Sequence, residues 1–433
     1  MDLNNRDIFQ YVLIGFFITM AVVAVILFST VRNQGPTDEE GNVLLPVTIW
    51  GYFPEEVMRI VLDRPDLEHV TYVEFSRADF YSSLLEAIAV GSPPDLVMVD
   101  QGTLRRFQDK LYQIPWESYP QQTFRRNFVE SAEVFSDQTG IWALPLSTDP
   151  MVMFWNRDIF ANSGLVEPPS YWGEVVDLTE VLNDIDDDQT INKSTVAFGE
   201  MRNVRNAKEV LSTLLLQSGV PITTQIGGTF EGELRYLRDD ADEPPAHTVL
   251  RFYTDFADPT RRVFSWDRAR PSDRDVFIAN DLALYFGYLT EYSTILNLNP
   301  TLNFDMALMP QPRGTDRRTT YARVTGLAIP AASQNRAGAW WVARRFTAPD
   351  IQGELGGETG RAPVLRSVLA EPQSTVYWST AFDSAIIGRT WLDPNPGASY
   401  RSFLSMVESV QSGRQSISQA VREAERELTN MGQ

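Results

Sequence analysis

The stretch VTYVEFSRADFYSSLLEAIAVGSPPDLVMVD, residues 70–100, decides the predicted fold. Its first six residues alternate as in a strand, and Phe80, Leu84 and Ile88 then recur on one helical face. A glycine followed by two prolines ends that helix. The apolar run at residues 95–100 is of the kind buried in a parallel sheet. Strand, helix and strand in this order predict an open α/β sheet.

The same pattern occurs just before this stretch, where an apolar run at residues 44–50 precedes helical spacing at residues 54–61. Ligands of open α/β sheets lie beyond the carboxyl ends of the strands. Residues 50–53 after the first strand, and Asp100 and Gln101 after the third, therefore become candidate binding positions. The alternative is that Trp50 is a packing residue and that Asp100 caps a helix.

Further helices are predicted where apolar residues recur with helical spacing, at residues 172–182, 339–346 and 417–428. The acidic run at residues 184–188 lacks the glycine and the terminal glutamate of a calcium-binding loop, so we predict a solvated loop there. Residues 227–246 are polar and rich in charge and proline, which predicts a surface insertion.

The composition excludes several classes of function. The 433 residues carry a formal net charge of −20, which repels nucleic acids. The chain has no cysteine and two histidines, so disulfides and thiolate metal sites are excluded and a histidine-rich metal site is disfavoured. We therefore predict that the protein uses no metal and no cofactor.

The N-terminal segment has the length of a membrane span. Residues 11–31, YVLIGFFITMAVVAVILFSTV, contain no charge and reach about 30 Å as a helix. We predict an uncleaved transmembrane anchor there, after a short N-terminus at residues 1–10 and before a polar linker at residues 32–42. Arg6 and Arg32 lie on opposite sides of the span and do not decide its orientation.

Common catalytic motifs are absent from the chain. It contains no G-x-S-x-G elbow, no Walker-type loop, no H-E-x-x-H and no G-x-G-x-x-G after a strand. Its 57 acidic residues leave open that two of them hydrolyse a glycoside. We predict that the protein is not an enzyme and keep glycoside hydrolysis as an alternative.

Residues 140–175, GIWALPLSTDPMVMFWNRDIFANSGLVEPPSYWGEV, carry the most specific resemblance. This stretch resembles the extracellular solute-binding proteins of bacterial ABC importers, in the maltose-binding-like branch that takes sugars. Residues 274–287, RDVFIANDLALYFG, are similar to a later motif of that family, with Asn280 and Asp281 in place of Gly-Lys and Leu284 in place of Met. The resemblance covers essentially the whole chain after residue 43.

The resemblance implies two α/β lobes of the periplasmic-binding-protein type II fold, with a small solute held between them. Residues 43–147 and 321–362 would form the first lobe, and residues 148–320 and 363–433 the second. The implied solute is a mono- or oligosaccharide, because acids, amides and aromatic rings suit sugar hydroxyls and ring faces. The ligand-binding residues that it implies are Trp50, Tyr52, Asp100, Gln101, Asp149, Glu200, Tyr288, Arg361 and Tyr400.

The resemblance also implies a place in the cell and a partner. The body of the protein would lie outside the cytoplasmic membrane, held by the anchor, with a cytoplasmic N-terminus at residues 1–10. The protein would be a monomer that delivers its solute to the permease subunits of an importer. A sensory or surface-adhesion module on the same fold is the alternative that does not involve transport.

Overall fold

The computed structural model describes residues 45–226, 229–237, 242–315 and 317–432. None of the helices within those residues is long and apolar enough to cross a membrane. The predicted span at residues 11–31 lies outside them, together with the predicted linker. The described chain divides into two compact units, and each is treated separately below.

The smaller unit comprises the described residues up to 96 together with residues 333–343. Its strands β1 and β2 are parallel neighbours, with Val47 opposite Val70, and each of its two helices buries an apolar face. The strand and helix order predicted from the sequence is confirmed here. These elements are β1 (Val47–Gly51), α2 (Glu55–Leu62), β2 (Val70–Glu74) and α3 (Phe80–Ala89).

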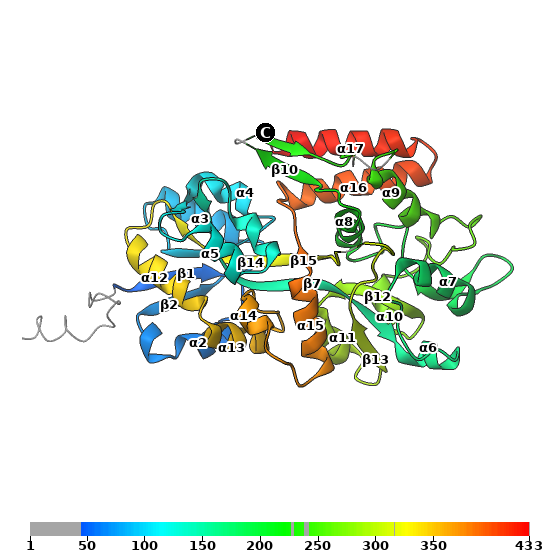
Figure 1. The fold of residues 1–433 in the computed structure, drawn as a ribbon, viewed down its shortest axis with the longest axis horizontal. Coiled ribbons are helices and arrows are strands. Elements are labelled where there is room, and N and C mark those ends of the chain that lie inside the picture. The colour runs from blue at the N-terminus through cyan, green and yellow to red at the C-terminus, as the bar shows by residue number, and fades with distance from the viewer. Residues whose placement is uncertain (1–44, 227–228, 238–241, 316, 433) are drawn as a thin grey trace, which may run out of the picture. The chain divides into compact units, whose positions relative to one another are not determined.

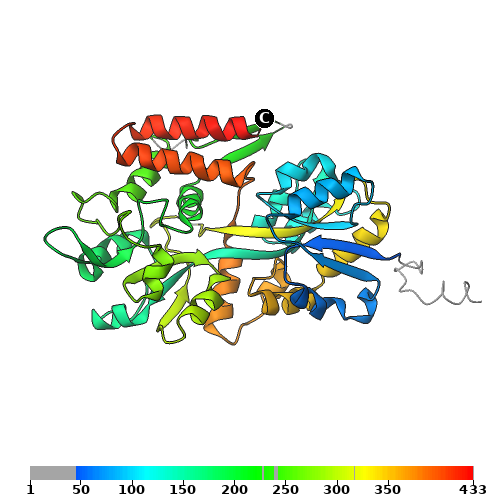
Figure 2. The ribbon, with the colours of Figure 1, turned by 180° about the vertical axis from the view of Figure 1, so that it is seen from behind.

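The larger unit comprises residues 97–332 and 344–432 and is organised around one long strand, β7 (Leu144–Asn156), which is buried at every position. Residues 144–150 of β7 pair with the antiparallel strand β14 (Thr320–Pro330). The remainder of β7 pairs with two other antiparallel strands, β12 (Leu282–Tyr288) and β13 (Phe304–Ala307). One strand therefore joins two groups of strands, as Figures 1 and 2 show for β7, β12 and β14.

Shorter strands extend the sheet of the larger unit on both sides and make it mixed. The shorter strands are β3 (Leu96–Asp100), β4 (Leu111–Tyr112), β8 (Asp184–Ile185), β9 (Ile191–Val196) and β15 (Gly388–Arg389). Of these, β3 runs antiparallel to β14, and β9 runs parallel to β12. Two separate pairs are β5 (Ile114–Pro115) with β6 (Gly140–Ile141), and β10 (Thr223–Ile226) with β11 (Thr229–Gly232).

Helices pack around this sheet. Helix α8 contacts β14, and the C-terminal helices α16 and α17 lie side by side, with α17 against strand β11 (Figures 1 and 2). The helices are α4 (Leu104–Phe107), α5 (Gln121–Asn127), α6 (Arg157–Asn162), α7 (Trp172–Leu182), α8 (Ala207–Gln217), α9 (Pro245–Asp255), α10 (Asp273–Ile278), α11 (Glu291–Leu298), α12 (Arg336–Phe346), α13 (Pro349–Thr359), α14 (Arg366–Leu369), α15 (Val376–Ile386), α16 (Pro396–Gln411) and α17 (Ile417–Met431).

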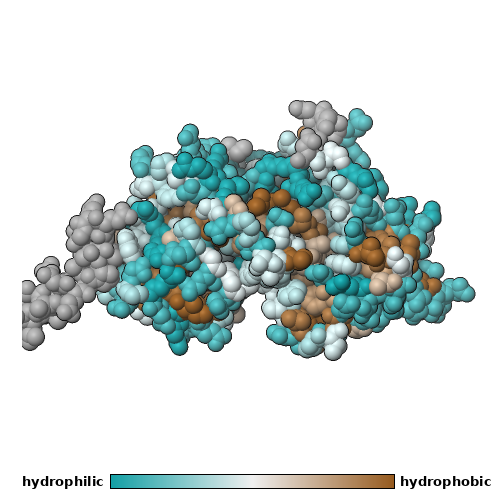
Figure 3. Space-filling view, turned by 60° about the horizontal axis from the view of Figure 1, so that its bottom comes forward, coloured by the Kyte–Doolittle hydropathy of each residue, from teal (hydrophilic) through white to brown (hydrophobic). Residues whose placement is uncertain are grey.

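Aromatic side chains fill the core of the larger unit. Phe198 lies at its centre, with ring centroids of Tyr253 and Phe286 each 5.3 Å away. Such tilted and edge-on pairs add to the free energy gained by burying the rings. Figure 3 shows a mainly hydrophilic face in which hydrophobic residues form separate patches. The packing of these rings gives β7, β12 and α8 a rigid base from which to present polar side chains.

Candidate ligand-binding site

Asp149 is the centre of the candidate site, and it is fully buried in the middle of β7. Its Oδ2 accepts hydrogen bonds from Arg323 Nη2 at 2.8 Å and from Arg361 Nη1 at 3.3 Å. Thr290 donates its hydroxyl to Oδ2 at 2.9 Å and its backbone N–H to Oδ1 at 3.1 Å. A carboxylate removed from water requires such partners. This cluster therefore fixes a charged group at the point where β7 passes from β14 to β12.

Arg323 links Asp149 to Tyr288. Its guanidinium lies 4.2 Å from the centroid of the Tyr288 ring, and the arginine side chain is 27% exposed. Burial alone would lower the pKa of Arg323, but Tyr288 and Asp149 raise it above its ordinary value. Tyr288 is only 8% exposed. A cation therefore lies over one face of the Tyr288 ring, and contact of this ring with a sugar stays a prediction.

Two glycines allow this cluster to assemble. Gly360 ends α13 with a φ of 64°, a conformation that favours glycine, and the chain then turns to place Arg361 near Asp149. A Cβ on Gly287 would lie 2.9 Å from Glu291 Oε1, which hydrogen-bonds to the backbone N–H of Tyr288. Both positions therefore require a residue without a side chain.

Gln101 is buried, and its amide group joins the end of β3 to β14. Its Nε2 donates to the Tyr321 hydroxyl at 2.9 Å, and its Oε1 accepts from the Val324 backbone N–H at 3.1 Å. Burial raises the pKa of the Tyr321 phenol, and the nearby charge of Glu209 adds to this effect. The amide of Gln101 thus links the end of β3 to β14, and contact of this side chain with ligand stays a prediction.

Asp100 stabilises the turn that follows β3. Its Oδ1 accepts hydrogen bonds from the backbone N–H groups of Gly102 at 3.0 Å and Thr103 at 2.9 Å. The Thr103 hydroxyl also donates to the same oxygen, at 3.0 Å. Asp100 thus has a local structural role in the turn at Gln101, although it does not cap α4, whose N-cap residue is Thr103.

Glu200 and Tyr400 lie near each other in the larger unit, with Met201 between them. Glu200 is buried and forms an ion pair with Arg268, at 3.1 Å between Oε2 and Nη2. The Tyr400 hydroxyl donates to the Met201 backbone carbonyl at 3.0 Å, while its ring remains partly exposed. Among the predicted aromatic residues of the larger unit, Tyr400 is partly exposed whereas Tyr288 is buried.

Trp50 and Tyr52 belong to the smaller unit. Trp50 lies at the end of β1, with its ring centroid 4.5 Å from that of Phe75. The guanidinium of Arg77 lies 3.8 Å from the centroid of the Tyr52 ring, and Phe80 contacts the same ring edge-on. Both residues are partly exposed at the carboxyl end of β1, where the sequence predicted them.

Three residues of the site were not predicted: Arg323, Thr290 and Glu209. Arg323 carried a signal, since a single arginine within the apolar run of residues 320–330 requires a buried partner. Glu209 carried none, because an acidic residue in the first turn of a helix is common. In the structure, Glu209 is partly buried in α8, and burial raises its pKa although Lys208 and Arg323 oppose the shift.

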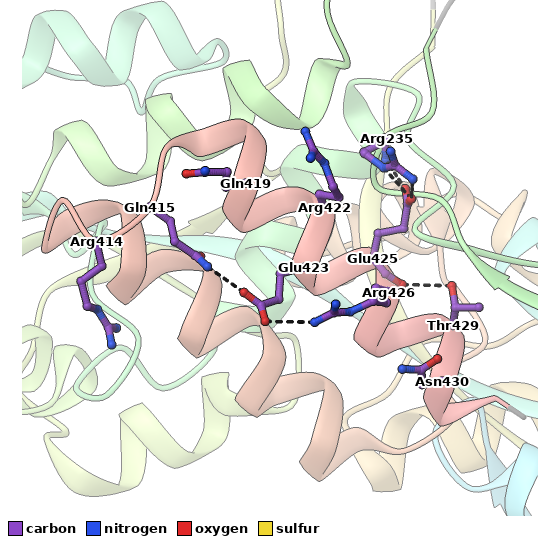
Figure 4. A pocket seen from close by; sticks show the side chains of 10 residues that line it. All are labelled: Arg235, Arg414, Gln415, Gln419, Arg422, Glu423, Glu425, Arg426, Thr429 and Asn430. Carbon is purple, nitrogen blue, oxygen red and sulfur yellow. Dashed lines mark hydrogen bonds and ion pairs between the residues drawn. The ribbon is translucent and has the colours of Figure 1, made fainter.

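An arginine-lined hollow of about 560 Å³ lies elsewhere, along α17. Figure 4 shows that its carboxylates are already paired, Glu423 with Arg426 and Glu425 with Arg235. No aromatic side chain lines it, and none of the predicted ligand-binding residues does. This hollow therefore lacks the ring faces that a sugar site needs. Within the described part of the chain, no group of acids and histidines could hold a metal ion.

Comparison with known protein families decides the identity of the fold. Residues 63–353 match the sequence model of the bacterial extracellular solute-binding protein family. The chain belongs to this family. A shorter match, 28% identical over 91 residues, is to a protein of Brucella abortus described as a binding protein. It covers 20% of this chain and 22% of that relative.

Solved structures of sugar-binding proteins have the same fold as this solute-binding protein. The cyclic alpha-maltosyl-1,6-maltose binding protein of Arthrobacter globiformis has a TM-score of 0.74 at 16% identity, over 90% of this chain and 99% of that one. The sugar-binding protein of Xanthomonas citri has a TM-score of 0.72 at 17% identity, over 89% and 97% of the two chains. A Thermotoga lettingae solute-binding protein bound to alpha-D-tagatose has a TM-score of 0.64 at 20% identity, over 90% and 100%. The chain thus has the two-lobed α/β solute-binding-protein fold.

Proposed function

We propose that this protein captures a small sugar and presents it to an ABC importer, without catalysing a reaction. The observation that carries the proposal is the polar and aromatic cluster around Asp149, on a fold shared with proteins whose structures contain sugars. Sugar sites combine such fixed polar groups with aromatic faces that pack on C–H patches. The family of binding proteins to which the chain belongs supports a receptor and gives no support to a hydrolase.

The proposed ligand contacts come from the predicted residues that keep accessible polar or aromatic groups. Tyr400 would supply a ring face, and Arg323 would supply donors that its contact with Asp149 leaves exposed. In this proposal Asp149, Gln101 and Asp100 have a structural role, because their polar atoms form hydrogen bonds with neighbouring residues of the protein.

The proposed setting is the outer face of the cytoplasmic membrane. Residues 11–31 would anchor a monomeric receptor there, with residues 1–10 inside the cell. Tethering raises the local concentration of a receptor near its permease, which is the role a lipid anchor would otherwise serve. The absence of cysteine from the chain agrees with an anchor that is not a lipidated cysteine.

A ligand screen tests the proposal. The full-length chain in a mild detergent would be titrated calorimetrically with mono- and oligosaccharides, with amino acids and with polyols. We expect saturable binding of at least one sugar and no hydrolysis of oligosaccharides. Binding of an amino acid alone, or release of monosaccharide from a glycoside, would contradict the proposal.

A further inference from the structure

The hollow along α17 gathers positive charge in a protein that is acidic overall. The whole chain carries 57 acidic residues against 37 basic ones, yet four arginines and two glutamates line this hollow. The arginines are Arg235, Arg414, Arg422 and Arg426. They come from the loop after β11, from the turn before α17 and from α17 itself. The fold of the larger unit, and not a local basic run, therefore builds this surface.

The two glutamates hold two of the arginines in place. Glu425 accepts hydrogen bonds from Arg235 Nε at 2.7 Å and from the Arg235 backbone N–H at 2.6 Å. Glu423 accepts from Arg426 Nη2 at 3.2 Å and from Gln415 Nε2 at 2.7 Å (Figure 4). A guanidinium has five N–H donors, so both arginines keep donors beyond those that their glutamates accept.

Arg414 and Arg422 have no carboxylate partner in the part of the chain that the structure describes. Arg414 donates from Nε to the Ser412 hydroxyl at 3.0 Å, which leaves its charge unpaired. Arg422 is exposed, and Figure 4 draws no interaction between it and either glutamate of the hollow. The hollow therefore holds more positive charge than its own acids neutralise.

The spacing of the arginines and their neighbours indicate what kind of anion fits. Arg422 and Arg426 are four residues apart on α17, which separates them by about 6 Å along the helix axis. Side chains two residues apart on one face of an extended peptide are separated by about 6.6 Å. Tyr236 and Leu237 follow Arg235 in the chain and are 43% and 52% exposed. Arginine and tyrosine are enriched in protein interfaces, which favours a peptide over a free inorganic ion.

We propose that this hollow is a docking surface for an acidic, extended segment of a partner protein. Carboxylates two residues apart in that segment would pair with Arg422 and Arg426, since the planar fork of a guanidinium suits bidentate contact with a carboxylate. Charge complementarity favours this occupant, because the segment would neutralise the positive charge that the hollow keeps. The inference goes beyond the proposed sugar site and does not depend on it, since none of the predicted ligand-binding residues lines the hollow.

Fluorescence anisotropy of a labelled peptide tests the proposal. The probe is Glu-Ala-Glu-Ala-Glu-Ala with blocked ends, added to the full-length protein in an uncharged detergent at about 0.1 M salt. We expect saturable binding that weakens as the salt is raised to about 0.5 M, because ion pairs between exposed groups are screened. The same peptide with glutamine in place of glutamate should not bind. Equal binding of the two peptides, no binding of either, or displacement by an equal concentration of inorganic phosphate would overturn the proposal.

Paired substitutions locate the binding. Arg422→Gln combined with Arg426→Gln should weaken binding of the glutamate peptide about ten-fold, because two exposed ion pairs are lost. Arg414→Gln, which lies outside the helix, should weaken it about three-fold even if the changes in α17 disturb that helix. Arg261→Gln combined with Arg262→Gln is the matched control, since these exposed arginines lie outside the hollow and their loss changes the net charge equally. Equal affinity of the two double variants would show that the peptide responds to overall charge and not to this hollow.

Discussion

Asp273 is the residue whose burial has the clearest consequence for stability. It is 2% exposed, and its Oδ1 accepts hydrogen bonds from the backbone N–H groups of Arg205 at 3.0 Å and Arg274 at 2.8 Å. Burial raises its pKa to about 7, although these two donors oppose the shift. Between its unfolded pKa of about 3.9 and this value, the folded protein holds a proton that the unfolded chain has released. Folding stability should therefore fall as the pH rises through that interval.

Asp273→Asn tests this linkage, since an amide oxygen can still accept both backbone hydrogen bonds. We expect the variant to be more stable than the wild type at about pH 8, by up to a few kcal/mol, and similar to it at about pH 4. Urea unfolding at the two pH values measures the difference. Asp258→Asn is the control, because the partly exposed Asp258 also accepts a backbone hydrogen bond, from Thr260, but has a lowered pKa. A parallel pH dependence in Asp273→Asn and the wild type would contradict the prediction.

Residues of the site differ in how far the sequence could reveal them. Asp149 lies in the stretch of most specific resemblance, so its position could be predicted. Its partners Thr290 and Arg361 are separated from it by 141 and 212 positions in the sequence, and no local pattern indicates such contacts. Tyr288 could be named as a ligand-binding residue, but the sequence does not show that Arg323 lies over its ring.

Elements were predicted well where the apolar spacing is regular. The helices α7, α12 and α17 begin or end within a few residues of the predicted ranges, because each has an apolar face with helical spacing. The pairing of β7 with β14, β12 and β13 was beyond the same reasoning. Those partners lie far apart in the chain, and all positions of β7 are buried, so no alternation marks its register.

The last helix, α17, offers a test at the level of an element. Ser416 and Gln419 form a capping box, in which Ser416 Oγ accepts from the Gln419 N–H at 3.3 Å and Gln419 Oε1 accepts from the Ser416 N–H at 3.0 Å. We expect Ser416→Ala to lower the free energy of unfolding by about 1 kcal/mol. Ser405→Ala, at an exposed position within α16, should change it by less than about 0.5 kcal/mol. Equal midpoints of urea unfolding for the two variants would show that the box adds nothing.

At the scale of the whole molecule, charge decides how the protein could stay at a membrane. The chain carries a formal net charge of −20, so its body is repelled by anionic lipid headgroups. Among the described residues no helix is long and apolar enough to cross the bilayer. We predict from the sequence that residues 11–31 form a span and that attachment depends on them.

Membrane fractionation tests this dependence. We expect the full-length chain to stay with the membranes through washes at about 1 M salt, where surface charge is screened, and to leave them only in detergent. Val22→Asp combined with Val25→Asp should release it into the wash, because each charge at the centre of a span costs about 2.5 to 3.5 kcal/mol. Asn33→Asp with Gln34→Asp places the same charges in the predicted linker and should leave attachment unchanged. Full-length protein in the salt wash, or equal release by both pairs, would show that residues 11–31 do not hold this receptor at the membrane.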